Sequence, residues 1–249
     1  MKPAILSVLF LIMASSISSA AFLASAEFLG FSDDGGYAAF EQYWIADGSG
    51  FPGAEIVVIS VPDSKIIRRF EIPWTEDMMY ENGSYVYYEN SMNPARTFLQ
   101  EKAYPYLDSL GISSGNEGVH CICHPLTDTD AEPASVSFVT WAGSLMYTGP
   151  EYRLSILSHK EMPDSPPDWL SMFDMPVLLE VLITDSSGNT VMHYLDDSPQ
   201  PVYEYISNYR IRDVYVFNDS LVAIIMNTTG PGFEGPDGMF RMVTGVIGH

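Results

Sequence analysis

The chain is poor in basic residues and in cysteine. It has 11 Lys and Arg against 32 Asp and Glu, a formal net charge of −21 at pH 7. A field of that sign repels nucleic acids and anionic membrane surfaces, so we expect neither as a partner. Two cysteines are too few for the disulfide framework of small secreted domains. Folding must therefore depend mainly on a hydrophobic core.

Long apolar segments are also missing after the amino-terminal region. The best run, residues 176–184, is short and contains Glu180, whereas a membrane-spanning helix needs about 20 apolar residues. We therefore expect no transmembrane segment once an export signal is removed. With 47% hydrophobic residues the chain is apolar enough to fold, and its length fits one domain.

The amino end has the layout of a cleavable export signal. Lys2 supplies a positive charge, residues 4–13 an apolar stretch, and residues 14–26 a run of small residues. Ala24-Ser25-Ala26 is the cleaner cleavage motif and predicts a mature start at Glu27; Ser18-Ser19-Ala20 is the alternative. The sequence thus predicts a signal peptide over residues 1–26 and a single β-rich domain over 27–249, secreted or periplasmic.

Most of the mature chain reads as strands rich in Val, Ile, Tyr and Phe, separated by clusters of Gly, Pro, Asn and Asp. This pattern predicts a mainly β fold of antiparallel sheets, arranged as a sandwich or in a propeller-like closure. The expected strands are 36–44, 54–61, 65–72, 134–141, 151–159, 177–184, 190–195, 211–217, 221–226 and 239–247.

One substantial helix is expected near residues 94–110. Asn93 can cap it, Pro94 suits its first turn and Gly111 can end it. Apolar residues between these limits recur every three or four positions. Pro105 lies inside and is expected to kink or split the helix. A shorter helix is expected at Trp169–Phe173.

The two ends of the mature chain show a short internal similarity. Phe31-Ser-Asp-Asp34 precedes a strand and the Gly-rich loop 48–53, and Phe217-Asn-Asp-Ser220 precedes a strand and the Gly-rich loop 230–235. Each unit therefore reads as turn, strand, long loop, strand. If the similarity is structural, it predicts two related hairpins with pseudo-symmetry.

Some of these segments carry a family resemblance. Residues 31–40, Phe-Ser-Asp-Asp-Gly-Gly-Tyr-Ala-Ala-Phe, resemble a repeat of TolB-type β-propellers, although a basic residue is common there in place of Gly36. Segments 30–35, 39–43, 47–52, 54–56 and 232–237 together resemble a family of predicted secreted bacterial proteins of unknown function. That resemblance implies export and a bacterial envelope, and it brings no catalytic residues.

The two Gly-rich loops are the predicted working surface. Their candidate binding residues are Asp47, Ser49, Phe51, Phe233, Glu234 and Asp237. Since no motif supplies a convincing catalytic set, the leading hypothesis is a non-catalytic binding or interaction module for an unknown envelope protein or polymer. An alternative is a hydrolase of envelope polymers that uses a carboxylate pair, because acidic side chains are abundant.

A metal-binding protein is the third hypothesis. The sequence predicts no cofactor, with calcium as the alternative. Asp33 and Asp34 lie in an acidic turn that could contribute oxygen ligands to calcium. Calcium is weighed there against ordinary turn chemistry, in which Asp bonds the local backbone.

The cluster His120-Cys121-Ile122-Cys123-His124 offers nitrogen and sulfur ligands. In a regular strand Cys121 and Cys123 would face one way and both histidines the other, so all four could not bind one ion. Two alternatives stay open. One is a metal site in which residues from elsewhere in the chain join both cysteines, and the other is a strained Cys121–Cys123 disulfide.

Overall fold

The structure is a computed structural model that describes residues 23–46, 49–72, 74–81, 84–128, 130–140, 149–160, 177–196, 206–230 and 237–247. The helix expected at Trp169–Phe173 and the first 22 residues of the expected signal peptide lie outside these ranges. Among the described residues, no helix combines the length and apolar character needed to cross a membrane.

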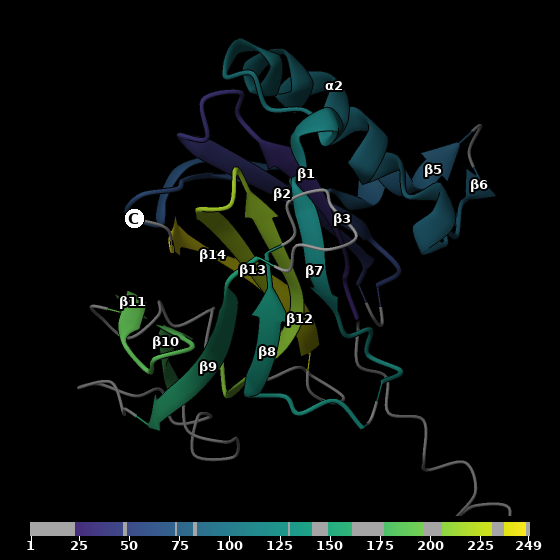
Figure 1. The fold of residues 1–249 in the computed structure, drawn as a ribbon. Helices are drawn as coiled ribbons and strands as arrows, with labels where there is room; N and C mark the ends of the chain where they lie inside the picture. Colours follow the sequence, from purple (N-terminus) through teal and green to yellow (C-terminus); the bar gives the residue numbers. More distant parts are fainter. Residues whose placement is uncertain are drawn as a thin grey trace, which may run out of the picture.

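The fold is mainly β, as predicted, with antiparallel sheets and one substantial helix (Figure 1). The N-terminal sheet has the order β1-β2-β3-β4, from Ser25–Phe31, Tyr37–Ile45, Pro52–Ser60 and Lys65–Glu71. The middle sheet has the order β14-β13-β12-β7, from Asp237–Val246, Leu221–Gly230, Asn208–Phe217 and Val119–Cys123. The outer sheet has the order β11-β10-β9-β8, from Thr190–Leu195, Val177–Asp185, Glu151–Lys160 and Ser135–Val139.

Smaller elements connect these sheets. A two-stranded hairpin consists of β5 (Tyr80–Glu81) and β6 (Ser84–Tyr85). Three short 3-10 helices are η1 (Glu76–Met79), η2 (Asn90–Met92) and η3 (Ser114–Asn116), and the long helix is α2 (Pro94–Ser109). The described part of α2 runs on through Pro105, so this proline does not split the helix.

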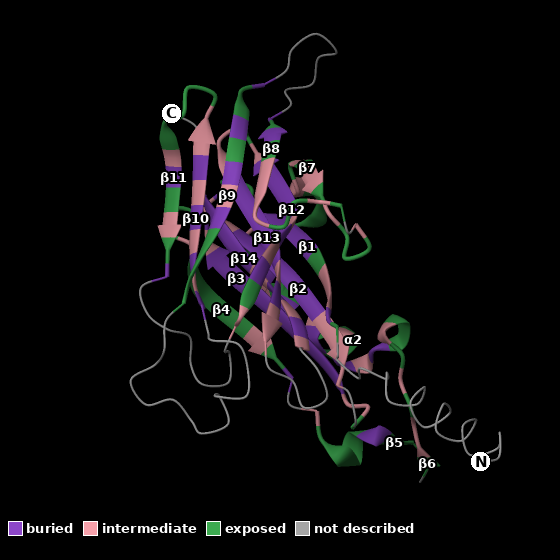
Figure 2. Ribbon diagram, turned by 90° about the horizontal axis from the view of Figure 1, so that it is seen from below, coloured by how far each residue is buried: buried purple, intermediate pink, exposed green. Residues whose placement is uncertain are grey.

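The three large sheets and α2 stack as four layers (Figure 1). Of the two predicted arrangements, this is the sandwich and not the propeller-like closure. The outer and middle sheets enclose one core, the middle and N-terminal sheets a second, and the N-terminal sheet and α2 a third. The middle sheet is therefore buried on both faces. This position explains why residues 222–226 of β13 are all apolar instead of alternating (Figure 2).

The two similar units of the sequence are three-stranded meanders packed face to face. One is β1-β2-β3 and the other is β12-β13-β14. Phe31 and Phe217, which occupy corresponding places in the two units, stack with ring centroids 5.2 Å apart and an interplanar angle of 14°. The internal similarity thus corresponds to two related meanders whose turns meet at one end of the sandwich.

Helix α2 covers the outward face of the N-terminal sheet, and polar side chains fix it there. The Asn93 side chain accepts hydrogen bonds from the backbone amides of Ala95 and Arg96, as its predicted capping role requires. Its amide group also donates to the carbonyl oxygens of Trp44 (2.8 Å) and Gly53 (3.1 Å). One buried residue therefore begins the helix and joins it to β2 and β3.

Strand β1 was not expected, because its first residues were interpreted as the end of a signal peptide. In the structure Ser25 and Ala26 pair with Tyr43 and Gln42 of β2. Ala24 is buried, and its amide donates to the carbonyl oxygen of Gly238 at 2.9 Å. Residues ahead of Glu27 are thus part of the folded domain.

Candidate metal centre

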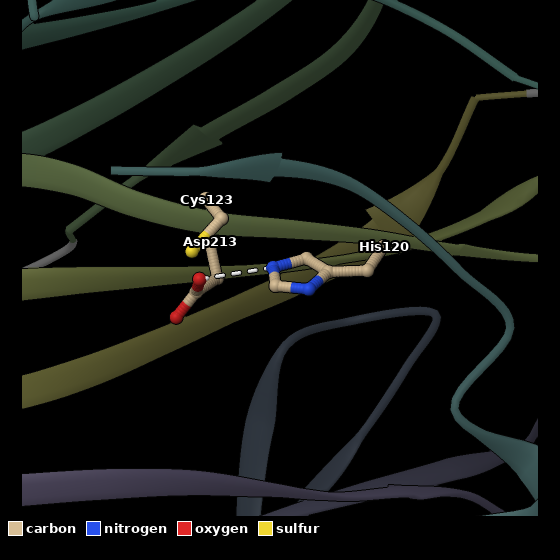
Figure 3. Close-up of side chains that lie close together, drawn as sticks. All are labelled: His120, Cys123 and Asp213. Carbon is tan, nitrogen blue, oxygen red and sulfur yellow. Dashed lines mark hydrogen bonds and ion pairs between the residues drawn. The ribbon is translucent and has the colours of Figure 1, made fainter. Parts of the chain in front are cut away.

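A mixed group of three metal-ligating side chains lies at the edge of the middle sheet. His120 and Cys123 belong to β7, and Asp213 belongs to the neighbouring strand β12. One ligand atom from each residue lies within 4.8 Å of the others, and they form the one such group of three among the described residues. Figure 3 shows the imidazole, the sulfur and the carboxylate pointing toward one another.

An irregularity in β7 brings the two β7 side chains to one face. Residues three apart in a regular strand point to opposite faces of a sheet. Here Cys123 is opposite Asp213 and Ile122 opposite Val214, but His120 is opposite Tyr215, so Cys121 is an extra residue. A bulge of this kind re-aims the side chains that follow it. His120 and Cys123 therefore face the same side as Asp213.

The aromatic surroundings fix the His120 ring. It stacks on the Tyr215 ring at a centroid distance of 4.3 Å and an interplanar angle of 10°. Tyr215 is itself stacked on Phe28 of β1, also at 4.3 Å. The imidazole is thus the outermost ring of a three-ring column that begins in the core between the N-terminal and middle sheets.

Asp213 is the buried member of the group, with 4% of its surface exposed. Its Oδ1 lies 2.9 Å from His120 Nε2, and its Oδ2 lies 3.3 Å from Arg212 Nε. Arg212 Nη1 also donates to the Ala26 carbonyl oxygen at 3.2 Å. The carboxylate is thus held by the imidazole at its first oxygen and by the guanidinium at its second.

The two cysteines differ in their surroundings. Burial raises the pKa of the Cys121 thiol to about 11, and Cys121 packs against the core between the middle and outer sheets. Cys123 is exposed; partial burial, followed by the charge of Asp213 and a hydrogen bond to it, raises the pKa of the Cys123 thiol. Both are free thiols, so the structure contains no Cys121–Cys123 disulfide.

The three ligand atoms, a nitrogen, a sulfur and an oxygen, determine which metal ions suit this group. Imidazole nitrogen and thiolate sulfur suit zinc and copper, whereas calcium and magnesium prefer ligands made entirely of oxygen. Three protein donors also leave at least one position of a four-coordinate ion for water or another ligand, as in exchangeable zinc sites rather than closed structural ones. The donor set is thus of the kind that suits a first-row transition ion rather than calcium or magnesium.

The sequence identified only part of this group. Cys123 was a candidate ligand and is in the cluster; Cys121, the other candidate, lies outside it. The expectation that both cysteines share a face, opposite the histidines, assumed a regular strand and is wrong because of the bulge. His124 lies just past the end of β7, and its Nδ1 is buried without a hydrogen-bond partner among the described residues.

Asp213 was missed because it lies 93 residues from its partner His120. The sequence does contain a signal, since Arg212 and Asp213 directly precede the apolar residues 214–217 in a strand of the middle sheet. A charged pair in such a strand needs partners. Sequence alone does not say which strand supplies them.

Of the two calcium candidates, Asp34 bonds the local turn, whereas Asp33 bonds a residue far away in the sequence. Asp34 Oδ1 accepts from the Ser32 hydroxyl (2.7 Å) and the Gly36 amide (2.9 Å), and these bonds, the Gly36 bond foremost, lower the pKa of Asp34. Asp33 Oδ1 accepts from the Asn116 side chain at 2.7 Å. Calcium binding at this turn stays a prediction.

The predicted loop surface is described only in part. Asp47, Phe233 and Glu234 lie outside the described residues. Ser49 accepts a hydrogen bond from the Phe51 amide through its hydroxyl (3.3 Å), and its carbonyl oxygen accepts one from Tyr85 Oη (2.9 Å).

Asp237, the remaining loop candidate, begins β14 and pairs with Gly230. The strands that flank the two loops meet, because the Phe240 amide donates to Gln42 Oε1 at 2.9 Å. The loops thus leave the same end of the sandwich.

Two carboxylates also lie together on the helix side of the N-terminal sheet. Glu27 and Glu41 both form ion pairs with Arg96 of α2. Gln100 donates to both oxygens of Glu41, and burial raises the pKa of this carboxyl although Arg96 opposes the effect. The arrangement holds α2 to β1 and β2, and the carboxylate-pair hydrolase gains no independent support from it.

Comparison with known proteins gives one match. Residues 39–245 match the family described as "Predicted secreted protein (DUF2259)". No curated protein and no solved structure matches the chain. The similarity of residues 31–40 to TolB-type propeller repeats stays a prediction.

Proposed function

The chain belongs to this family of predicted secreted proteins, and from that premise we propose that it is an exported binding protein for a zinc or copper ion. His120 Nε2, Cys123 Sγ and Asp213 Oδ1 are the protein ligands. The observation that carries the proposal is the convergence of a nitrogen, a sulfur and an oxygen donor within 4.8 Å of one another.

Two features support binding rather than chance proximity. The bulge at Cys121 places the exposed Cys123 thiol beside His120 and the buried Asp213, which a regular strand would not do. The stacked rings of His120 and Tyr215 also restrict the imidazole before an ion arrives. Such preorganisation reduces the entropy lost when the ligands are fixed around the ion.

Zinc is expected to raise the melting temperature of the purified exported protein by about 5–10 °C when free zinc is about 100-fold above its dissociation constant. A ligand that binds only the folded state stabilises it by mass action. Differential scanning fluorimetry with zinc, with calcium and with a chelator measures the effect. A rise with calcium alone would point to the acidic turn and loops instead.

Matched variants make the experiment specific. Cys123→Ala is expected to abolish the zinc-dependent rise, and Cys121→Ala, at the neighbouring cysteine, to retain it. His120→Phe keeps an aromatic ring to stack on Tyr215 but removes the nitrogen ligand, so it should also abolish the rise. An equal response to zinc in all three variants would rule out this centre.

For export, we propose cleavage of the signal after Ala20 rather than after Ala26. Cleavage after Ala26 would remove the buried Ala24 and the two β1 residues that pair with Tyr43 and Gln42. Cleavage after Ala20 follows the Ser18-Ser19-Ala20 motif and leaves all of β1 in the mature protein.

The mature protein is therefore expected to begin at Ala21. Intact-mass measurement and amino-terminal sequencing of the exported protein give the boundary directly. A bulky residue before the cleaved bond blocks processing, so Ala20→Phe should accumulate precursor. A mature terminus at Glu27 would refute the proposal and would mean that β1 is shortened in the exported protein.

A further inference from the structure

Aromatic rings that are exposed or half-buried gather on the segment that leads into α2. Five aromatic residues, which we name the tyrosine platform, lie here: Trp74, Tyr80, Tyr85, Tyr87 and Tyr88. Figure 1 shows the β5–β6 hairpin of this segment beside α2, at the edge of the molecule. None of the five belongs to the metal centre or to its strands.

The platform is held together by ring contacts but stays open to solvent. Tyr85 packs edge-on against Tyr80 at a centroid distance of 5.3 Å, and its ring lies tilted against the Tyr87 ring at 5.0 Å. Tyr87 nevertheless has 82% of its surface exposed, and Tyr80 48%. Exposed aromatic side chains that cluster, instead of scattering singly, are typical of interaction sites.

The platform is anchored at its base, so its rings are presented in a fixed arrangement. Met79 is fully buried, and Trp74 Nε1 lies 3.2 Å from its sulfur. Tyr85 Oη donates to the Ser49 carbonyl oxygen at 2.9 Å. The platform therefore adjoins the Gly-rich loop that the sequence indicated as a binding surface.

Its charge has one sign. Between Glu71 and Arg96 the sequence has four acidic residues and no Lys or Arg. These acids, all exposed, are Glu76, Asp77, Glu81 and Glu89. The Tyr88 hydroxyl donates to Glu81 at 3.5 Å, so carboxylate and rings are adjacent. Tyrosine faces attract cations through the ring quadrupole, and neighbouring carboxylates add to that attraction.

We propose that the tyrosine platform binds a cationic segment of a partner protein, with Lys or Arg side chains placed over Tyr80 and Tyr87 beside Glu76 and Glu81. Arginine suits the site best, since its planar guanidinium stacks on aromatic faces and pairs with carboxylates. The net charge of −21 also accelerates the approach of a basic partner. The proposal is independent of the metal centre.

Fluorescence anisotropy with a labelled octa-arginine peptide and the full exported protein tests this site. The double variant Tyr80→Ser/Tyr87→Ser removes two ring contacts and is expected to raise the dissociation constant about 5- to 30-fold. Its melting temperature should be unchanged, since both rings are exposed. The control, Phe98→Ser, removes an exposed ring of α2 (44% exposed) and should change binding less than about 2-fold.

Charge variants separate the platform from the general acidity of the protein. Glu76→Gln/Glu81→Gln and Glu101→Gln/Asp108→Asn each remove two exposed acids, the second pair from α2. The proposal requires the first pair to weaken peptide binding by a clearly larger factor. Equal effects of the two pairs, together with unchanged binding of the tyrosine variant, would mean attraction by net charge alone and would overturn it. Tyrosine-dependent binding of a neutral oligosaccharide, without tyrosine-dependent binding of the peptide, would also overturn it.

Discussion

Replacing Arg241 with methionine is expected to lower the free energy of unfolding by about 3–5 kcal/mol, because it leaves a buried carboxylate without its cation. Arg241 of β14 forms an ion pair with Asp196, whose side chain is 3% exposed. The guanidinium also donates to Tyr209 Oη at 2.9 Å and to Tyr194 Oη at 2.8 Å. This network joins the outer sheet to the middle sheet.

The stability lost in Arg241→Met depends on pH, and the pKa of Asp196 gives the direction of that dependence. Burial opposes ionisation of Asp196, but hydrogen bonds and charge from Arg241 outweigh it and hold the pKa of Asp196 below its ordinary value. The pair therefore contributes its stability above the unfolded pKa of about 3.9, and the contribution disappears as pH falls through the lower folded pKa. The destabilisation by Arg241→Met should accordingly be largest near neutral pH and shrink in acid.

Urea unfolding at several pH values measures both effects. Arg153→Met is the matched control, because this exposed arginine of β9 donates to the Ser135 hydroxyl at the surface and should change stability by less than about 0.5 kcal/mol. Adding Asp196→Leu to Arg241→Met should recover part of the loss by removing the orphaned charge. A loss below about 1 kcal/mol for the single variant would show that Asp196 does not depend on Arg241.

Phe31→Ala is expected to lower the free energy of unfolding by a similar amount, about 3–5 kcal/mol. Phe31 is fully buried where the two meanders meet. It stacks on Phe217 and also contacts the Phe28 ring edge-on at 5.2 Å. The variant therefore loses apolar burial and the ring contacts with Phe28 and Phe217, the second of which joins the two related units.

A double-mutant cycle with Phe217→Ala isolates the ring contact. The coupling energy between positions 31 and 217 should be about 0.5–1.5 kcal/mol, the range for aromatic pairs. Phe98→Ala, at a partly exposed ring of α2, should change stability much less. Strictly additive effects at positions 31 and 217 would contradict a direct contribution from the stack.

How far the sequence predicts the fold depends on the kind of signal each segment carries. Strands β3 and β13 were predicted because each contains a run of apolar residues, 56–59 and 221–226, between turn residues. Helix α2 was predicted from Asn93, Pro94 and Gly111, and Gly111 does adopt the positive φ, 68°, that ends a helix. These signals depend on residues that are neighbours in the sequence, and the structure contains the elements that they predict.

Prediction from sequence is ambiguous where a local pattern supports two physical roles. Small residues at positions 24–26 suit a signal peptidase, but they also suit a strand packed closely on its neighbours, which is what the structure shows. The alternation rule placed His120 and Cys123 on opposite faces, and one extra residue, Cys121, reversed that result. Bulges depend on the partner strand, so a single segment does not reveal them.

The absorption spectrum of the cobalt-loaded protein tests the central claim, a metal ion held by His120, Cys123 and Asp213, most directly. Cobalt(II) replaces zinc in such sites, and a thiolate ligand gives it a charge-transfer band in the near ultraviolet. The account predicts that this band saturates at one cobalt per protein, persists in Cys121→Ala and is absent in Cys123→Ala. No band in the native protein, or a band that Cys123→Ala leaves unchanged, would contradict it.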